Sequence, residues 1–417
     1  MLLKLYKALN ILLTPIIGLL LIYRVWKKKE DKTRIKERLG IAKKARPNKK
    51  LIWIHAASVG ETISTIPLIQ ILSADSKITI LLTSGTVTSG KLVKSILPKN
   101  VIHQYVPIEN YFAIKNFLKH WKPNLTIFVE SEFWPCILSE TSKVSKIISL
   151  NTRLSDSSFK IWKTQKQAFS DISKLFSLFL PQSINDFEKL KSLGVKKLKY
   201  IGNIKYTVPP LIADERKLAI LADELRSKKV VLFISSHPGE EEIIHQIYKE
   251  AKKIIPSLIF IIAPRHPNRS NHIHSMLSSN NYKLAVRSKH QHISPDTDFY
   301  IADTIGELGT LIRVSTISVI CGTFVKTGGH NPIEAAKLKS AVIIGPYFSK
   351  QAEICSEFKK HKAAIMVKNH RECVKAICLL FSSQPTIKTY LANASKLINS
   401  KNNILRDTVL AIRHYIK

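Results

Sequence analysis

Carboxylate side chains follow two apolar segments in the first half of this 417-residue chain. Glu61 comes shortly after an expected strand at 51–54, and Glu130 and Glu132 follow another at 125–129. A carboxylate that faces a cleft can act as a general base. Structural roles are the alternative: Glu61 would complement the dipole of the helix it opens, for about 0.3–1 kcal/mol, and one of the other two would cap a helix. The residues alone leave both interpretations open.

Nitrogen donors stand at a corresponding place in the second half. Arg265, His266 and Arg269 come directly after an expected strand at 258–263. Guanidinium and imidazole groups in such a position suit a phosphate or a carboxylate. An ordinary exposed loop is the alternative.

A glycine pair precedes another junction. Gly328 and Gly329 would let backbone amides approach a phosphate closely. Asn331 is a natural N-cap, Pro332 fits the first helical position, and Glu334 fits the third. The start of such a helix binds anions because its N–H groups are unpaired. The alternative is an ordinary loop before a well-capped helix, which has a similar sequence pattern and binds no ligand.

Apolar runs alternate with amphipathic stretches from residue 51 onward, which predicts mostly parallel sheets covered by helices. The strands expected in the first half are 51–54, 78–82, 125–129, 146–150 and 199–202. Those expected in the second half are 230–235, 258–263, 299–301, 318–321 and 341–344. The helices expected most clearly are 62–72, 114–120 and 214–226. We therefore expect an α/β protein with two Rossmann-like domains facing a cleft, and ligands at the carboxyl ends of the strands.

Several classes of site are missing from the sequence. It contains no G-x-G-x-x-G, no G-x-x-x-x-G-K-[ST] and no H-E-x-x-H, which argues against dinucleotide redox enzymes, P-loop NTPases and zincins. The five cysteines include no C-x-x-C pair, so free thiols in a reducing compartment are expected. Asp296 and Asp298 resemble an acidic metal motif but stand in a polar loop. We expect no metal site and no cofactor.

The first 26 residues are strongly apolar. As one helix, residues 2–23 would be about 33 Å long, enough to cross a bilayer core if two lysines snorkel. Residues 24–50 then carry 13 Lys and Arg against three acidic residues, and the positive-inside rule puts the rest of the chain in the cytoplasm. We expect an N-terminal membrane-anchor helix in the cell inner membrane, spanning or monotopic. A buried helix of a soluble domain is the alternative.

The net charge is strongly positive, since 65 Lys and Arg against 30 Asp and Glu give +35. This excess attracts anionic partners such as nucleic acid, anionic lipid or phosphorylated substrates. Lysine outnumbers arginine by 51 to 14, a bias that genome composition also produces. Because the anchor and the basic segment after it adjoin each other, we expect anionic inner-membrane lipid as a partner and no nucleic acid.

Taken in order, these junctions resemble those of the 3-deoxy-D-manno-octulosonic acid (Kdo) transferases of lipopolysaccharide biosynthesis, glycosyltransferase family 30. The resemblance covers essentially the whole chain. The shared motifs are H-x-x-S-V-G-E at 55–61, E-S-E-F-W-P at 130–135, N-T-R-L-S at 151–155, G-N-I-K at 202–205, S-H-P-G-E-E at 236–241, P-R-H-P at 264–267, D-T-I-G-E-L at 303–308 and G-G-H-N-P-I-E at 328–334.

The resemblance implies a GT-B fold and a single-displacement, inverting transfer of Kdo from a CMP-Kdo donor to the lipid A precursor, lipid IV(A). It makes Glu61 the general base, and Glu130 and Lys205 the stabilisers of the transition state. The residues it assigns to binding CMP are Pro264, Arg265, Ile305, Gly306, Glu307, Asn331, Pro332, Ile333 and Glu334. It divides the chain into an anchor (1–26), an acceptor-binding domain (27–206), a linker (207–228), a CMP-Kdo-binding domain (229–395) and a C-terminal helix (396–417).

The sequence departs from the family pattern at four positions. Ser131 and Ser236 replace threonines, and Ile305 replaces a methionine, all of them conservative changes. Thr207 stands where an aspartate is usual, which changes the chemistry of a place next to Lys205. Another GT-B sugar-nucleotide transferase or epimerase with a different donor is the closest alternative. A non-catalytic protein that coats lipid or nucleic acid is a more distant one.

Overall fold

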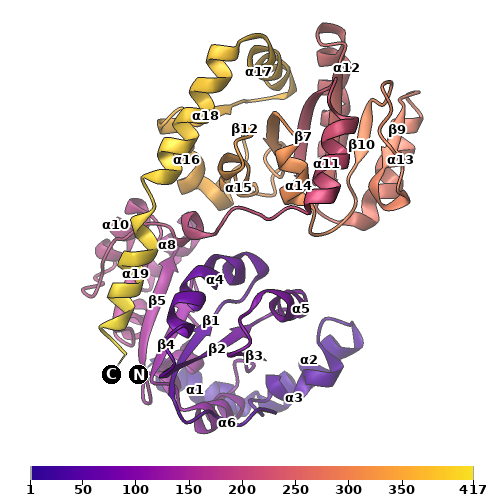
Figure 1. The fold of residues 1–417 in the computed structure, drawn as a ribbon. Coiled ribbons are helices and arrows are strands. Elements are labelled where there is room, and N and C mark those ends of the chain that lie inside the picture. Colours follow the sequence, from indigo (N-terminus) through magenta and orange to yellow (C-terminus); the bar gives the residue numbers. More distant parts are fainter. Residues whose placement is uncertain (1, 417) are drawn as a thin grey trace. The chain divides into compact units, whose positions relative to one another are not determined.

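The computed structural model describes residues 2–416, which form two compact units. The first comprises the chain up to Val208 together with the segment from Asn402 onward, and the second is Pro209–Lys401 (Figure 1). Met1 and Lys417, the outer ends of the expected anchor and C-terminal helix, lie outside the described residues.

The first unit is built on a six-stranded parallel sheet in the order β3-β2-β1-β4-β5-β6. Its strands are β1 (Lys50–His55), β2 (Ile78–Ser84), β3 (Val101–Tyr105), β4 (Leu125–Val129), β5 (Lys146–Thr152) and β6 (Leu178–Pro181). Its helices are α1 (Leu2–Leu12), α2 (Thr14–Trp26), α3 (Ile35–Arg38), α4 (Val59–Ser73), α5 (Val87–Ile96), α6 (Tyr111–Trp121), α7 (Pro135–Thr141), α8 (Asp156–Thr164), α9 (Lys166–Ser173), α10 (Ile184–Ser192) and α19 (Asn403–Arg413), with 3₁₀ turns η1 (Lys32–Arg34) and η2 (Ile204–Thr207).

The second unit is built on a seven-stranded parallel sheet in the order β13-β12-β11-β7-β8-β10-β9. Its strands are β7 (Lys229–Ser236), β8 (Leu258–Pro264), β9 (Leu284–Val286), β10 (Phe299–Ile301), β11 (Ile317–Ile320), β12 (Ala341–Ile344) and β13 (Ala364–Met366). Its helices are α11 (Glu215–Glu224), α12 (Glu240–Ile254), α13 (Ser270–Ser278), α14 (Leu308–Arg313), α15 (Ile333–Lys337), α16 (Ala352–Lys360), α17 (His370–Ser382) and α18 (Gln384–Asn399), with 3₁₀ turns η3 (Pro267–Arg269), η4 (Arg287–Lys289) and η5 (Ser349–Gln351).

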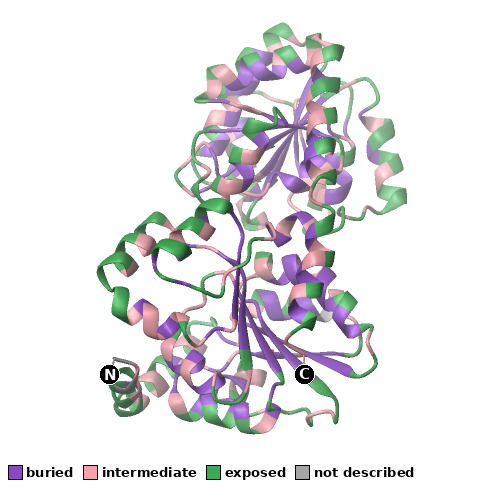
Figure 2. Ribbon diagram, turned by 90° about the vertical axis from the view of Figure 1, so that its left-hand side faces the viewer, coloured by how far each residue is buried: buried purple, intermediate pink, exposed green. Residues whose placement is uncertain are grey.

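Both faces of each sheet are buried, which is why the strands read as continuous apolar runs rather than alternating ones. In β1, Leu51 and Trp53 join one core of the first unit, and Ile52 and Ile54 join the core on the opposite face. Figure 2 shows the strands of both units as buried ribbons, with exposed residues on the outer sides of the helices. The α/β fold with two parallel sheets is therefore confirmed.

The strand order reverses between β1 and β4 in the first sheet and between β7 and β11 in the second, where β10 also inserts between β8 and the edge strand β9. At such a switch point the chain leaves neighbouring strands toward opposite faces of the sheet, and the loops diverge to form a crevice. The carboxylates singled out in the sequence follow β1 and β4. The H-P-G-E-E and G-G-H-N-P segments follow β7 and β11.

The expected strand at 199–202 is wrong. In the structure Leu198 makes one isolated bridge with Phe179 of β6, and Gly202 has a φ of 124°, outside the extended region. A Cβ at Gly202 would lie 2.7 Å from the Ile404 side chain of α19. The apolar pattern of this segment therefore reflects packing against the C-terminal helix rather than a ladder.

The single anchor helix expected over residues 1–26 is also wrong. The segment forms two helices, because Pro15 in the first turn of α2 lacks the N–H that would continue the hydrogen bonding of α1. Among residues 2–416, no individual helix is long and apolar enough to cross a bilayer. The pair Leu5–Leu12 and Thr14–Trp26, bent by 60° at its break, reaches that length and apolar content when taken together.

Polar contacts fix α1 to the rest of the first unit. Asn10 is buried, donates to the Glu109 carbonyl oxygen (2.7 Å) and accepts from the Tyr111 N–H (2.8 Å). The Lys7 ammonium lies 3.0 Å from the Glu140 carboxylate of α7. The apolar side chains of the two helices therefore point away from these contacts, and many of them are exposed.

Replacing Gly40 by alanine should destabilise the first unit by about 2–5 kcal/mol. Gly40 has a φ of 78°, and a Cβ there would collide with the Ala113 carbonyl oxygen and lie 2.8 Å from the Phe117 nitrogen, both in α6. Thermal or denaturant unfolding of the detergent-solubilised protein measures the loss. The control is Gly18→Ala in α2, where a Cβ meets nothing within 4 Å. Equal stability of the two variants would refute the close contact.

Candidate active site

Glu61 lies in the first turn of α4, immediately after β1. Its carboxylate accepts from the Ala57 N–H (2.8 Å) and the Ser58 hydroxyl (2.7 Å), while Ser58 Oγ accepts from the Glu61 N–H (3.3 Å). Ser58 is the N-cap of α4 and Glu61 stands in its first turn, so the carboxylate also has the helix-start position considered from the sequence. Burial nevertheless raises the pKa of Glu61 above its ordinary value of 4.5, and the negative charge of Glu130 raises it further.

Glu130 leaves the end of β4 in the left-handed conformation, with a φ of 62°. For a residue other than glycine this backbone geometry is costly, about 1–3 kcal/mol, and such strain gathers at functional sites. The Glu130 carboxylate lies 2.9 Å from the Lys205 ammonium, and both side chains are largely buried. This ion pair lies close enough to Glu61 for the Glu130 charge to act on it.

Two asparagines place Lys205. Asn151, at the end of β5 and also left-handed (φ 56°), accepts the Ile204 N–H at 3.0 Å. Asn203 caps the 3₁₀ turn η2 by accepting the Lys205 N–H, also at 3.0 Å. The Thr207 hydroxyl donates back to the Ile204 carbonyl oxygen (2.8 Å), so the residue that departs from the family pattern closes the same turn.

Glu132 forms an ion pair with His55 and does not cap a helix. Its carboxylate lies 3.5 Å from His55 Nε2 and accepts from Trp134 Nε1 at 2.6 Å. On its other side, His55 Nδ1 lies 3.0 Å from the Thr83 hydroxyl of β2. Burial alone would raise the pKa of Glu132, but the hydrogen bond and charge of His55 lower it overall.

The expectation that Glu130 or Glu132 caps a helix is wrong. The N-cap of α7 is Trp134, which makes no side-chain cap. Instead Glu109, far earlier in the chain, accepts from the Cys136 (2.6 Å) and Ile137 (3.2 Å) N–H groups of this helix. Burial raises the pKa of Glu109 to about 7. Both carboxylates of the E-S-E motif therefore stay at the strand end.

In the second unit, two histidines meet at the switch point. His237 follows β7, His330 follows β11, and their Nε2 atoms lie 2.8 Å apart with nearly parallel rings. One nitrogen must donate and the other accept, so the pair holds at most one shared proton in this contact. Burial, followed by the nearby His237, lowers the pKa of His330 to about 4.

Two buried carboxylates hold the loops around these histidines. Glu240 accepts from the N–H groups of His237 (3.0 Å), Gly322 (2.8 Å) and Phe324 (3.0 Å), which joins the loops after β7 and β11. Its neighbour Glu241 accepts from Arg269 at 3.1 Å. The two glutamates of the H-P-G-E-E motif therefore hold the loops of this unit in place.

Arg265 remains available for a ligand. It is exposed beyond Pro264 at the end of β8, and none of the carboxylates in residues 2–416 lies within salt-bridge distance of it. Its charge lowers the pKa of His237, although burial lowers that pKa more. Burial raises the pKa of Glu334, while the charge of Arg265 opposes the rise. Arg265, Glu334 and the histidine pair therefore influence one another electrostatically.

The helix after the glycine pair begins one residue later than expected. α15 starts at Ile333 with Pro332 as its cap, and Asn331 accepts the Ile333 N–H at 3.1 Å. The helix has only five residues, so its dipole is small. Gly328 and Gly329 do have positive φ angles, 96° and 80°, and a Cβ on Gly328 would lie 2.7 Å from Lys350.

The I-G-E segment follows β10, two strands away from β7. Ile305 is highly exposed and Gly306 is left-handed (φ 90°). Glu307 is held by Arg287 (3.0 Å) and Lys217 (2.7 Å), and chiefly the hydrogen bond from Arg287 lowers the pKa of Glu307 to about 2. Its carboxylate is thus committed to two cations of its own unit.

Comparisons with known proteins agree with this geometry. A family model described as 3-deoxy-D-manno-octulosonic-acid transferase (kdotransferase) matches residues 33–208. A 3-deoxy-D-manno-octulosonic acid transferase of Rickettsia bellii (strain RML369-C) is 37% identical over 415 residues, 99% of each chain. The chain belongs to the Kdo transferase family. It is therefore a glycosyltransferase, and the alternative of a non-catalytic coating protein is wrong.

Two solved structures share the fold of this Kdo transferase family member. A glycosyltransferase from Rickettsia africae ESF-5 gives a TM-score of 0.63 at 15% identity and covers 89% of this chain and 100% of that one. A putative UDP-N-acetylglucosamine 2-epimerase from Listeria monocytogenes gives 0.61 at 9% identity, with 88% and 96% covered. Both support the expected GT-B-like class, and neither says anything about the donor.

Sequence reasoning missed several residues that shape this site. The asparagines that hold η2 and the distant cap Glu109 lie far from their partners in the sequence, so no local spacing reveals them. Lys350 adds positive charge near both histidines and contributes to lowering the pKa of each. Nothing in its own segment distinguishes it from the other lysines of a lysine-rich chain.

Substituting Glu130 by glutamine should lower the pKa of Glu61. The change removes a negative charge that raises this pKa. Carbon-13 NMR titration of the glutamate side chains in the wild type and in Glu130→Gln measures it. Glu188→Gln on α10 is the control. An unchanged or higher pKa in Glu130→Gln would contradict the arrangement.

Proposed function

We propose that this glycosyltransferase moves Kdo from CMP-Kdo to a lipid A precursor, lipid IV(A), in lipopolysaccharide biosynthesis. The observation that carries the proposal is the half-buried Glu61 carboxylate with a raised pKa at the β1–β4 switch point, next to the Glu130–Lys205 pair. Membership of the Kdo transferase family supports the identity of the sugar. The groups of the second unit that suit a phosphate, Arg265 and the glycine pair, support an anionic sugar donor.

Glu61 is the general base in this proposal. Its carboxylate takes the proton of the acceptor hydroxyl as that oxygen forms a bond to the anomeric carbon of Kdo. The bond from this carbon to the CMP phosphate oxygen breaks at the same time, and its electron pair leaves with CMP. A single displacement inverts the configuration at the anomeric carbon and needs no covalent enzyme intermediate. A base with a raised pKa suits the step, because proton transfer is most efficient when the pKa approaches the working pH.

Glu130 and Lys205 stabilise the transition state electrostatically. Positive charge develops on the sugar ring as the bond to CMP lengthens, and the Glu130 carboxylate offsets it. The Lys205 ammonium, 2.9 Å from the Glu130 carboxylate, holds that carboxylate in place. Both groups are fixed by salt bridge and backbone contacts before substrate binds, so little reorganisation is needed.

CMP-Kdo binds, in this proposal, to the switch point of the second unit. The Arg265 guanidinium is exposed, carries no salt-bridge partner among the described residues and suits a phosphate bidentately. The glycine pair before Asn331 allows backbone amides to approach the ligand. The segments Pro264–Arg265, Ile305–Glu307 and Asn331–Glu334 supply the contacts, the middle one mainly through its backbone because Glu307 is already paired.

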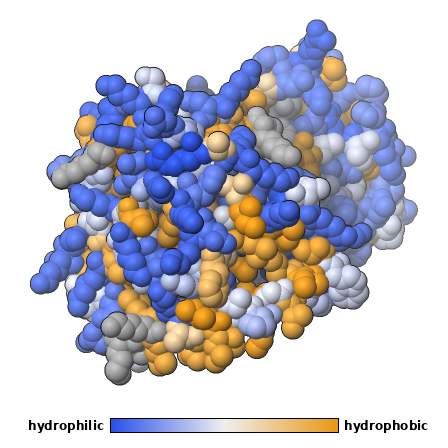
Figure 3. Space-filling view, turned by 90° about the horizontal axis from the view of Figure 1, so that it is seen from below, coloured by the Kyte–Doolittle hydropathy of each residue, from blue (hydrophilic) through white to orange (hydrophobic). Residues whose placement is uncertain are grey.

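The first unit docks on the cytoplasmic face of the inner membrane through α1 and α2. Figure 3 shows apolar side chains gathered into a continuous area, bordered by hydrophilic ones, on the face that carries these helices. The most exposed of the large apolar residues there are Leu12, Ile16, Leu19, Ile22 and Trp26. An amphipathic element with adjoining lysines lies in the interface of an anionic membrane. The acceptor lipid and the enzyme then share one surface.

Glu61→Gln should abolish transfer while leaving donor binding intact. The amide can still accept the Ala57 N–H but cannot take a proton, so the rate should fall by about 10²–10⁴-fold. Product formation from CMP-Kdo and tetraacylated lipid A precursor gives the rate, and calorimetry with CMP gives nucleotide affinity. Glu188→Gln serves as the matched control. Turnover like that of the wild type in Glu61→Gln would remove Glu61 from the mechanism.

Leu19→Glu with Ile22→Glu should weaken membrane binding by about tenfold or more, since two exposed apolar side chains would no longer enter the interface. Co-sedimentation with vesicles of phosphatidylethanolamine and phosphatidylglycerol measures the bound fraction. Leu410→Glu, an equally exposed leucine on α19, is the control and should bind as the wild type does. Undiminished binding by the double variant would contradict docking through α2.

A further inference from the structure

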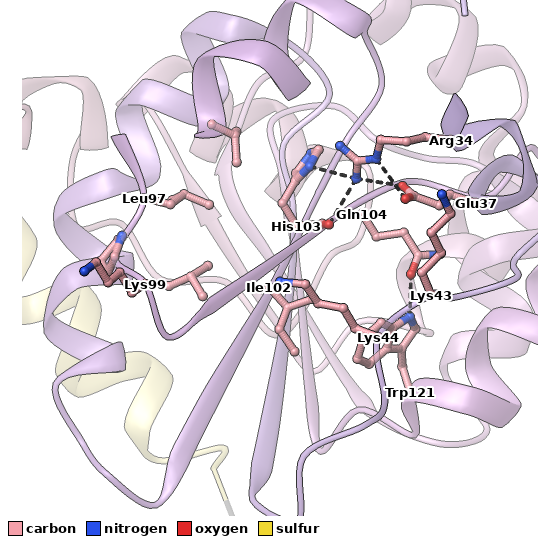
Figure 4. Close-up of a pocket in the computed structure, with 13 residues that line it drawn as sticks. Arg34, Glu37, Lys43, Lys44, Leu97, Lys99, Ile102, His103, Gln104 and Trp121 are labelled. Atoms are coloured by element: carbon pink, nitrogen blue, oxygen red, sulfur yellow. Dashed lines mark hydrogen bonds and ion pairs between the residues drawn. The ribbon is translucent and has the colours of Figure 1, made fainter. Parts of the chain in front are cut away.

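A cavity of about 440 Å³ lies in the first unit at the outer edge of its sheet (Figure 4). It opens beside β3, the edge strand, between the segment after α3 and the loop that leads from α5 into β3. This volume falls within the range of small-molecule sites, about 300–1,000 Å³. Neither the proposed reaction nor the proposed donor site uses any residue of the cavity.

The floor of the cavity is apolar. Ile102 of β3 and Trp121 of α6 belong to one core of the unit, Val93 and Leu97 belong to the core on the opposite face of the sheet, and all four line the cavity at the sheet edge. The indole N–H of Trp121 donates to the Gln104 side-chain oxygen at 2.8 Å, which fixes the ring. The floor can therefore pack against the hydrocarbon part of a ligand.

The rim carries cations. Arg34, Lys43, Lys44 and Lys99 line the cavity, together with a single carboxylate, that of Glu37. In Figure 4 the arginine lies at the upper rim beside His103 and the lysines approach from the right and left. A ligand in this cavity would meet positive charge around an apolar floor.

The arginine and the carboxylate are already occupied with each other. Arg34 makes two 2.8 Å hydrogen bonds to Glu37 and a third, of 3.1 Å, to the His103 carbonyl oxygen of β3. The Glu37 carboxylate also accepts a hydrogen bond from the Tyr105 N–H of the same strand, at 2.8 Å. These bonds satisfy the exposed edge of β3, and the Arg34 and Glu37 charges cancel.

The lysine charges are not cancelled. None of the carboxylates in the described part of the chain lies within 4 Å of the ammonium groups of Lys44 or Lys99, and Lys43 donates only to the Thr33 carbonyl oxygen (3.1 Å). Three cations with no counterion thus surround an apolar floor. This combination fits a molecule with one phosphate and a short apolar body.

The cavity is separate from the candidate active site. Leu97 and Lys99 precede β3 and so lie at the amino end of the sheet, whereas Glu61 and Glu130 follow the carboxyl ends of β1 and β4. β2 also stands between β3 and β1. A ligand in the cavity would therefore bind apart from the reacting groups.

The cavity adjoins the helices proposed to meet the membrane. Arg24 of α2 lies 2.8 Å from Glu30, and Glu30 lies 3.1 Å from Arg38 of α3, so salt bridges connect the end of α2 to the helix that carries Glu37. The segment from Trp26 to Lys44 runs from the exposed apolar area to the rim. A lipid of the same membrane is the source that this continuity favours.

We propose that this cavity binds one anionic phospholipid, with its phosphate on Lys43, Lys44 and Lys99 and the first part of its acyl chains on Ile102, Leu97 and Trp121. The lipid would act as a specific membrane ligand beside the acceptor, and its binding does not depend on the Kdo transfer reaction.

Calorimetric titration of the detergent-solubilised full chain tests the proposal with three probes. Dihexanoyl phosphatidic acid carries both phosphate and chains, inorganic phosphate carries no chains, and dihexanoyl phosphatidylcholine has no net charge. We expect saturable binding of phosphatidic acid with one molecule per chain, and affinities at least about tenfold lower for the other two probes.

Two cavity variants and two control variants locate the site. Lys44→Ala with Lys99→Ala should weaken phosphatidic acid binding by about tenfold or more, and Leu97→Trp, which fills the cavity, should do the same. Lys191→Ala with Lys196→Ala, two exposed lysines elsewhere on the unit, should leave it unchanged, and so should Leu19→Glu with Ile22→Glu in the exposed apolar area. If Leu97→Trp fails to fold, Lys44→Ala with Lys99→Ala still tests the site, because it changes only exposed lysines.

The outcomes separate the alternatives. If inorganic phosphate binds as tightly as phosphatidic acid, the cavity is a simple anion site and the lipid assignment is overturned. Equal binding by the cavity and control variants overturns the site itself. If Lys44→Ala with Lys99→Ala instead raises the KM for the lipid A precursor, the cavity belongs to the acceptor site and the inference of a separate lipid is overturned.

Discussion

The reversal of strand order in each parallel sheet is the constraint on which the rest of this structure depends. It puts the ends of β1 and β4 side by side in the first unit and those of β7 and β11 side by side in the second. Loops leave such neighbouring strands toward opposite faces, so polar groups gather where the backbone has to diverge. Glu61 and Glu130 meet at one of these places, and His237 and His330 at the other.

Electrostatic pairing then decides which of the gathered groups can react. The Lys205 ammonium pairs with Glu130 and the His55 ring pairs with Glu132, while Glu61 accepts from a hydroxyl and a backbone amide. Burial and the neighbouring negative charge raise the pKa of Glu61, whereas for Glu132 the hydrogen bond and charge of His55 outweigh burial and lower the pKa. In the second unit the motif carboxylates bind backbone amides and an arginine, and Arg265 has no salt-bridge partner in the part of the chain that the structure describes. The switch point of each unit therefore has residues that hold the loops in place and residues that can contact a substrate.

The sequence predicted what is periodic and local, and failed where distant segments meet. Central strands were found because parallel sheets bury both faces of a strand, whereas β3, β6, β9 and β13 are edge strands, short or polar enough to lack that signal. The break between α1 and α2 needed the effect of Pro15, which a count of apolar residues ignores. The place of Glu61 in the first turn of a helix was readable from spacing. The cap that Glu109 gives α7, the turn held by Asn151 and the contact of two histidines were not, because each joins residues that only the fold brings together.

The central claim is that Glu61 is a general base whose pKa its surroundings raise. The pH dependence of kcat/KM for Kdo transfer by the wild-type enzyme tests it most directly, because the base must be deprotonated to act. As pH falls through the raised pKa, activity should be lost at a pH above 4.5, the ordinary value for a glutamate. Full activity maintained down to pH 4.5 or below would contradict the account.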